Sequence, residues 1–171
     1  MKTTDPRSYN LRNADITYYP NFLTTELADS FLEFFLKKLH WEQFDIKIFG
    51  KVIPQPRLTA LYAINTQPYS YSNLTLQPNS YTTELEIISN KLFKLTGIRF
   101  THCLANLYRD GNDSMGWHSD DEKELGQNPV IASISLGAER KFQLKHKMLK
   151  DKKMEIPLEH GSLLIMKGET Q

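Results

Sequence analysis

The sequence contains one cysteine, Cys103, and no apolar run long enough to cross a bilayer. A single cysteine excludes an intramolecular disulfide framework and is typical of a reducing compartment. The first residues lack the apolar core of a secretory signal. We therefore expect an intracellular protein with no membrane partner, cytoplasmic in a bacterium or nuclear in a eukaryote.

A strong charge of either sign is also missing, since the formal net charge is +1. Any nucleic-acid contact must therefore depend on local basic clusters. With 171 residues and 40% hydrophobic content, we expect one domain over residues 1–171, acting as a monomer. Two basic clusters are present, although an ordinary solvated face explains them equally well: Lys47, Lys51 and Arg57, and Arg140, Lys141, Lys145, Lys147, Lys150, Lys152 and Lys153.

Two segments carry apolar residues at helical spacing. In the first, Thr24 is a candidate N-cap, and Phe31 and Phe35 follow on one face. The second spans residues 82–95, and Gly97 stands where it would end the helix. Both patterns predict helices that pack on a core.

The remaining apolar segments are short and strand-like. Several short strands beside two helices predict an α+β protein whose sheet closes on itself. Residues 67–80, rich in Pro, Ser, Asn and Tyr, are typical of a surface loop. The predicted strands are 46–49, 58–62, 100–108, 130–136, 141–145 and 162–166.

His118 and Asp120 lie in a segment that is otherwise suited to a strand. Alternate residues of a strand point to the same face. An imidazole and a carboxylate on one face supply two ligands of the 2-His-1-carboxylate triad, which holds Fe(II) and leaves positions open for oxygen and a co-substrate. By itself His-x-Asp is a weak signal, because a solvated surface histidine beside acids gives the same pattern.

The neighbouring motifs sharpen this interpretation. They are Asn106-Leu-Tyr108, Trp117-His-Ser-Asp-Asp-Glu122, Pro129-Val-Ile-Ala-Ser-Ile-Ser-Leu-Gly137, Arg140-Lys-Phe142 and His160-Gly-Ser-Leu-Leu-Ile-Met166. In this order and spacing they closely resemble the AlkB family of Fe(II)/2-oxoglutarate-dependent nucleic-acid dealkylases, above all its eukaryotic-type DNA repair members. The resemblance extends over residues 49–171.

The resemblance implies a double-stranded β-helix, or jelly roll, with the two helices packed on the sheet and iron between its two sheets. The strand pattern alone does not separate this fold from another sandwich. The resemblance also implies that His118 and Asp120 ligate Fe(II), that Asn106 and Tyr108 donate hydrogen bonds to 2-oxoglutarate, and that O2 is consumed. Without the motif, Asn106 and Tyr108 would be an ordinary strand asparagine and a half-buried tyrosine.

The third metal ligand is missing from this pattern. In relatives a second metal histidine follows shortly after the segment matching residues 168–171, and two arginines that bind 2-oxoglutarate lie further on, with the final strands. We expect either a C-terminally incomplete enzyme, which the agreement upstream favours, or a natural short form with impaired chemistry. The residues alone would suggest His160 as the third ligand, but the resemblance implies that it is a structural residue of a turn.

The resemblance further implies a methylated nucleic-acid base as substrate, flipped out of its helix. Tyr69 and Tyr71 match an aromatic pair that stacks the base, and Tyr71 is the preferred stacking residue. Asp121 and Glu122 match acids that face the cationic edge of 1-methyladenine or 3-methylcytosine. A solvated acidic turn is the alternative explanation for these two.

Four further positions match the surroundings of the base. Arg57 and Tyr62 match a strand that covers the substrate. Phe49 matches the tip of a hairpin that some relatives insert into the duplex, although a phenylalanine in this setting is as often plain core. Arg140 is a candidate phosphate contact or an ordinary surface arginine.

The implied activity is oxidative dealkylation of DNA or RNA, in which an N-methyl carbon is oxidised and formaldehyde leaves while 2-oxoglutarate becomes succinate. The missing ligand leaves open a catalytically silent nucleic-acid-binding module of the same fold. A third alternative is a 2-oxoglutarate oxygenase that acts on protein or small molecules. Tyr71, Asp121, Glu122 and the Phe49 hairpin weigh against it.

Overall fold

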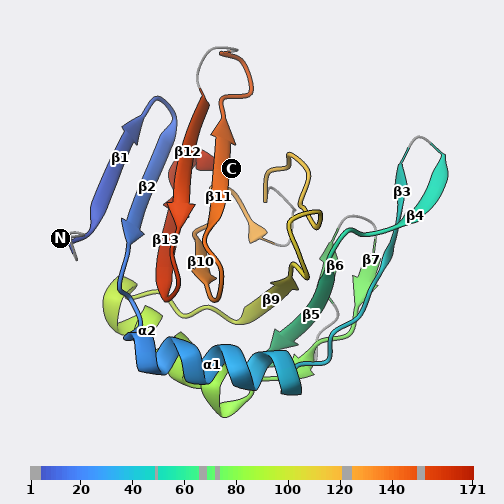
Figure 1. Ribbon diagram of the computed structural model, residues 1–171. Coiled ribbons are helices and arrows are strands. Elements are labelled where there is room, and N and C mark those ends of the chain that lie inside the picture. The colour runs from blue at the N-terminus through green and yellow to red at the C-terminus, as the bar shows by residue number, and fades with distance from the viewer. Residues whose placement is uncertain (1–4, 49, 66–68, 72–73, 121–124, 150–152) are drawn as a thin grey trace. The chain divides into compact units, whose positions relative to one another are not determined.

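The computed structural model describes residues 5–48, 50–65, 69–71, 74–120, 125–149 and 153–171 (Figure 1). The chain divides into two compact units, Met1–Lys37 with Leu125–Gln171, and Lys38–Glu124. Two α-helices and many antiparallel strands confirm the α+β prediction. Within the described ranges, none of the helices has the length and apolar character needed to span a membrane. That residues 1–171 act as one domain stays a prediction.

The described part of the first unit contains two antiparallel sheets. Each pair of neighbouring strands in the larger sheet is hydrogen-bonded in antiparallel register. A short 3-10 helix, η2 (Gly168–Thr170), follows its last strand. The larger sheet has the order β1 (Arg7–Leu11), β2 (Ala14–Tyr19), β13 (Ser162–Lys167) and β10 (Ile131–Ser135), and the smaller one pairs β11 (Arg140–Lys145) with β12 (Lys153–Leu158).

One buried cluster joins the two sheets of this unit. Its members alternate along each strand, as expected when every second side chain points to the same face. Burying one such large apolar side chain stabilises the fold by roughly 1.5–3 kcal/mol. The buried members are Ile16 and Tyr18 of β2, Ile156 and Leu158 of β12, and Leu164 and Met166 of β13.

Helix α1 spans Thr25–Lys38 and begins where the sequence predicts. The Thr24 hydroxyl accepts a hydrogen bond from the backbone N–H of Leu27 at 3.3 Å, which satisfies one of the free donors of the first turn. Phe31 and Phe35 are buried. The prediction of a core-facing helix is confirmed.

Gly161 provides a close approach beneath the start of this helix. Its φ of +74° is unfavourable for residues with a side chain, and a Cβ there would lie 3.0 Å from the carbonyl oxygen of Leu23 and 3.3 Å from Cβ of Ala28. The Gly161 carbonyl also accepts a 3.0 Å hydrogen bond from the Leu23 N–H. Only glycine fits this contact without displacement of the backbone.

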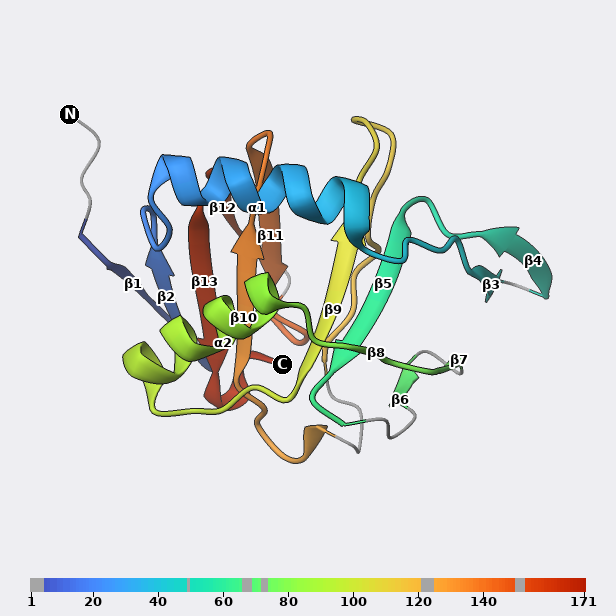
Figure 2. The same cartoon turned by 90° about the horizontal axis from the view of Figure 1, so that it is seen from below.

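In the residues that the structure describes, the second unit contains three small sheets and the helix α2. Strands β5 and β9 lie side by side in antiparallel register, as Figure 2 shows. The three-stranded sheet has the order β8 (Asn79–Ser80), β5 (Leu58–Ala63) and β9 (His102–Leu107); the other two are the hairpins β3 (Asp45–Ile48) with β4 (Lys51–Pro54), and β6 (Tyr69–Tyr71) with β7 (Leu74–Leu76).

Helix α2 spans Thr83–Thr96. The side chain of Thr82 caps its start by accepting the N–H of Leu85 at 3.3 Å. At its end Gly97 adopts a φ of 72°, and its N–H donates to the Phe93 carbonyl at 2.8 Å. The predicted helix and its glycine stop are confirmed.

The sequence-based predictions of irregular structure and strands were partly wrong. Residues 67–80 form short strands in their described parts instead of a continuous loop, because β6 pairs with β7 and β8 pairs with β5. Strands β1, β2, β4 and β12 were not predicted. The six predicted strands are all present, with ends that differ by a few residues.

Candidate functional site

His118 and Asp120 approach each other in the second unit, with His118 Nε2 at 3.4 Å from Asp120 Oδ1. They do so without a strand. The chain from Tyr108 to Asp120 forms neither helix nor strand, so the expectation that these two residues alternate along a strand is wrong. The turns of the segment, and not strand periodicity, bring the two donors together.

The orientation of the His118 ring is set by a backbone carbonyl. Nδ1 lies 2.9 Å from the Gly116 oxygen, so in the neutral ring Nδ1 carries the hydrogen and Nε2 presents a lone pair to Asp120. A lone pair and a carboxylate that face each other require a cation between them. A proton or a metal ion would satisfy both.

The His118 pKa reflects this arrangement. It is raised above its ordinary value, chiefly by the hydrogen bond with Asp120, while the Gly116 carbonyl adds to the rise and partial burial and the nearby Arg57 oppose it. The same attraction for positive charge would act on a metal ion.

The donor geometry fits a shared metal ion. Two ligands at right angles on one octahedral ion, each about 2.1 Å from it, are about 3.0 Å apart. The observed 3.4 Å separation is close to that value, and the two side chains are 40% and 23% exposed, so an ion can reach them. Across the parts of the chain that the structure describes, no group of three or more His, Cys, Asp or Glu side chains is placed to hold a metal.

Asn106 lies on β9 opposite Thr59 of β5. Its Oδ1 accepts a 2.9 Å hydrogen bond from Nε of Arg57, a side chain that is only 4% exposed. Because the oxygen is engaged, the amide N–H groups of Asn106 are the part left to meet another acceptor such as a carboxylate. Tyr108 is half-buried and lies just past the end of β9, so only Asn106 of the predicted pair is on the strand.

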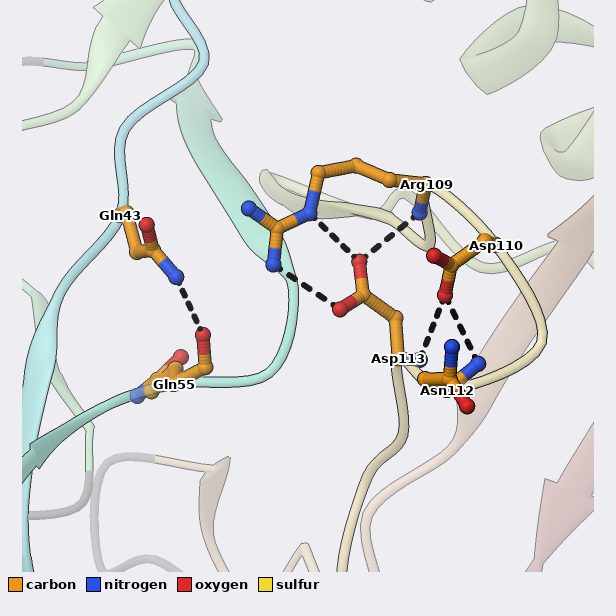
Figure 3. Close-up of polar contacts among 6 residues, drawn as sticks. All are labelled: Gln43, Gln55, Arg109, Asp110, Asn112 and Asp113. Atoms are coloured by element: carbon orange, nitrogen blue, oxygen red, sulfur yellow. Dashed lines mark hydrogen bonds and ion pairs between the residues drawn. The ribbon is translucent and has the colours of Figure 1, made fainter.

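A compact polar loop follows these two residues (Figure 3). The Asp113 carboxylate accepts three hydrogen bonds from Arg109, at 2.8 Å from the backbone N–H, 2.8 Å from Nε and 2.9 Å from Nη2. Asp110 Oδ1 accepts the backbone N–H groups of Asn112 and Asp113 at 2.8 and 3.3 Å. Sequence reasoning did not single out Arg109 and Asp113; the turn-forming run Asp-Gly-Asn-Asp was the available signal.

A second set of polar contacts supports the start of β5. The Gln43 side-chain amide donates to the Gln55 carbonyl at 2.8 Å (Figure 3). The Gln55 N–H donates to the Phe44 carbonyl at 2.8 Å. Glu42 forms a bridge with Thr59. These contacts hold the start of β5 and the segment just before it, which carries Arg57.

The proposed base-binding residues are described only in part. Tyr69 and Tyr71 are the ends of β6, and their side chains are outside the description. Phe49, Asp121 and Glu122 lie outside the described residues altogether, although the hairpin β3–β4 that flanks Phe49 is present.

Tyr62 and Arg140 are the remaining candidates from the sequence. Tyr62 is buried in β5, and its hydroxyl accepts the His40 backbone N–H at 3.0 Å. Arg140 is half-buried and begins β11 in the first unit. Among the clustered basic residues, Lys141 forms an ion pair with Glu155 at 3.1 Å.

His160 belongs to a turn of the first unit. Its Nδ1 accepts the Gly137 N–H at 2.8 Å, which leaves the hydrogen of the neutral ring on Nε2, 3.2 Å from Asp29 Oδ1. Nδ1 therefore has a local role in the turn, whereas Nε2, although close to Asp29, is buried and makes no hydrogen bond. This arrangement agrees with the expectation that His160 is structural.

Comparisons with known proteins place these features in context. A model of the 2OG-Fe(II) oxygenase superfamily matches residues 15–171. The chain is 39% identical over 165 residues to human "Alpha-ketoglutarate-dependent dioxygenase alkB homolog 3", covering 91% of the chain and 57% of that relative. It is 33% identical over 190 residues to "DNA oxidative demethylase ALKBH2" of Arabidopsis thaliana, covering 92% and 59%.

The chain is also 39% identical over 132 residues to human "DNA oxidative demethylase ALKBH2", covering 73% of the chain and 51% of that relative. The chain therefore spans less than two thirds of the length of these relatives. The similarities confirm the resemblance to AlkB-type proteins that the motifs indicate.

Proposed function

Because the chain belongs to the 2OG-Fe(II) oxygenase superfamily, we propose that it provides an Fe(II)- and 2-oxoglutarate-dependent site for oxidative removal of N-methyl groups from nucleic-acid bases. The approach of His118 Nε2 to Asp120 Oδ1 carries the proposal. These two side chains would hold Fe(II), and the Gly116 carbonyl would orient the imidazole through Nδ1.

Each of the other polar residues has a defined part. The amide N–H groups of Asn106 donate to a carboxylate of 2-oxoglutarate, since Arg57 occupies the amide oxygen. The Tyr108 hydroxyl is a second donor to the same co-substrate. When bound, the iron and 2-oxoglutarate supply the oxidation of the N-methyl carbon by O2, with succinate, carbon dioxide and formaldehyde as products.

The proposed fold is a jelly roll. Support comes from the first unit, where two antiparallel sheets share the cluster around Ile16, Ile156 and Leu164. Helix α1, which belongs to the same unit, would pack on the outside of such a sheet.

The proposed substrate is 1-methyladenine or 3-methylcytosine in DNA or RNA, and the similarity to "DNA oxidative demethylase ALKBH2" supports this class. Tyr71, with Tyr69, stacks the flipped base, and Asp121 and Glu122 face its cationic edge. Phe49 fills the gap left in the duplex. In the same scheme Arg57 and Tyr62 border the base and Arg140 contacts a phosphate.

Metal binding and turnover test the proposal on the 171-residue chain. We expect it to bind Mn(II), followed by loss of the free-ion electron paramagnetic resonance signal, and we expect His118→Ala to weaken binding at least about tenfold. The control His102→Ala changes a histidine on β9 and leaves binding unchanged. Equal Mn(II) binding by the parent chain and His118→Ala would contradict the metal site.

For turnover, the chain is incubated with Fe(II), 2-oxoglutarate and a 1-methyladenine oligonucleotide. Formaldehyde and succinate in equal amounts are expected. Absence of both products rejects dealkylation by this chain. A catalytically silent binding module is the second candidate. It is favoured because, among the residues that the structure describes, no group of three potential ligands comes together, whereas the triad for Fe(II) needs three. Such a module would retain the methylated oligonucleotide without forming product.

A further inference from the structure

The loop Arg109–Asp113 connects the two pairs of residues on which the proposed function depends. Asn106 and Tyr108 come immediately before it, and His118 and Asp120 follow within seven residues of its end. No helix or strand holds this stretch, so its shape depends on side-chain contacts. Those contacts decide how the co-substrate pair and the metal pair are spaced.

Asp113 makes the central contacts of the loop. The residue is 6% exposed, and its two oxygens accept three hydrogen bonds from Arg109, two of them from the guanidinium in a fork. A fork between guanidinium and carboxylate constrains direction as well as distance. A buried carboxylate that lost this partner would be strongly unfavourable, so the loop has little freedom to open.

The exit of the loop is anchored to the segment just before β5, the strand that pairs with the strand of Asn106. The Ser114 N–H donates to the Pro56 carbonyl at 2.9 Å. Arg57, which follows Pro56 in the chain, donates through Nε to Asn106 Oδ1 at 2.9 Å. The path from Asn106 through the loop therefore returns to the start of β5 before it continues to His118. Asp113 stands directly before this anchor.

We propose that Asp113 is a positioning residue that fixes the metal pair, His118 and Asp120, relative to the co-substrate residues Asn106 and Tyr108. This inference rests on the proposed function for the identity of the two pairs. Asp113 acts by locking the loop through Arg109.

The test compares Asp113→Asn with Asp110→Asn in the complete chain. Asparagine at 113 keeps the size of the side chain but removes the charge, and it turns an amide N–H toward the guanidinium. Asparagine at 110 keeps Oδ1, the atom that accepts the Asn112 and Asp113 N–H groups, so it is a matched control in the same loop. His118→Ala serves as the reference for loss of the metal site.

Two measurements are made on each variant. In Mn(II) titrations, Asp113→Asn weakens binding about tenfold while Asp110→Asn changes it less than about twofold. In hydrogen exchange, Asp113→Asn accelerates exchange of the Ser114 amide about tenfold or more, whereas amides of the β5–β9 pairing keep their rates. Arg109→Gln gives the same result, and combining it with Asp113→Asn adds little, because both remove one interaction.

The outcomes distinguish the positioning role of Asp113 from the proposed metal site itself. If His118→Ala abolishes Mn(II) binding and Asp113→Asn leaves both binding and Ser114 exchange unchanged, the positioning role is overturned and the metal site stands. If His118→Ala has no effect on Mn(II) binding, the proposed function fails. Faster exchange throughout β5 and β9 in Asp113→Asn would mean that Asp113 stabilises the whole unit, which also overturns the positioning role.

Discussion

Strand β13 and the segment from Tyr108 to Asp120 are held in place by opposite means. Residues Ser162 to Met166 are at most 5% exposed and pack by apolar contact, whereas the second segment is irregular and is held by hydrogen bonds of Asp110, Asp113 and Gly116. Packing tolerates changes of polarity poorly and small changes of shape better. Directional polar contacts set side-chain positions at an exposed site.

The largest effect is expected when packing is removed from β13. Leu164→Ala empties a fully buried position in the cluster of the first unit, and we expect unfolding free energy to fall by about 2–5 kcal/mol. Urea unfolding followed by circular dichroism measures the change. The control Leu36→Ala, at a 47% exposed position of α1, changes stability by less than about 0.5 kcal/mol. Similar losses in both variants would contradict the packing argument.

The thiol of Cys103 tests burial on β9 in the unit that carries the candidate site. Burial raises its pKa from 9.0 to about 11, so the folded state disfavours the thiolate. Below pH 9 the thiol is neutral in both states, and between pH 9 and 11 the unfolded chain ionises first. Unfolding free energy should therefore fall with rising pH, by about 2–3 kcal/mol over this range.

Chemical denaturation of the parent chain and of Cys103→Ala across this range measures the effect. The alanine variant lacks this component, so its curve is flatter. Tyr81, whose pKa is raised mainly by burial, contributes to both proteins. Parallel curves for the two proteins would show that the thiol is as readily ionised in the folded state as in the unfolded one.

Gly161 and Gly111 differ in how much space the backbone leaves for a side chain. Gly161→Ala places a Cβ 3.0 Å from the Leu23 carbonyl at a φ of +74°, and it should cost about 1–3 kcal/mol. Gly111→Ala, in the polar loop, has no atom within 4 Å of the added Cβ and no positive φ, so its effect stays below about 0.5 kcal/mol. Thermal unfolding ranks the two variants. A larger loss of stability for Gly111→Ala than for Gly161→Ala would contradict this prediction.

The smallest predicted effect concerns the start of α2. Thr82→Ala removes the acceptor of the Leu85 N–H and should lower unfolding free energy by about 1 kcal/mol. Thr83→Ala, one residue into the helix, is exposed and causes no loss. The same urea experiment compares them, and equal stability of the two variants would count against the cap.

Several elements were predictable because their signals are local. The cap at Thr24 and the stop at Gly97 depend on residues a few positions apart. Strand β12 was missed although its apolar residues alternate, because Pro157 within the run argues against a strand. The short strands β6 and β7 were missed because their composition is that of a loop and pairing alone makes them strands.

The candidate site was predictable in its residue types but not in its geometry. His118 and Asp120 were selected from the motif, but the strand expected to align them is absent. Turn-forming residues between Asp110 and Asp113 override the strand propensity of the flanking sequence. Arg109 and Asp113 went unnoticed, since a charged pair in a polar run has no distinctive pattern.

Local sequence patterns were sufficient to predict the two helices and the residue types of the proposed metal ligands, since helical periodicity and capping act over a few residues. The folded arrangement decided the contact between Arg57 Nε and Asn106 Oδ1, because it depends on the register that sets Thr59 opposite Asn106. It also decided the 3.4 Å approach of His118 to Asp120. Such contacts arise from strand pairing and loop closure between distant segments, and no short stretch of sequence encodes them.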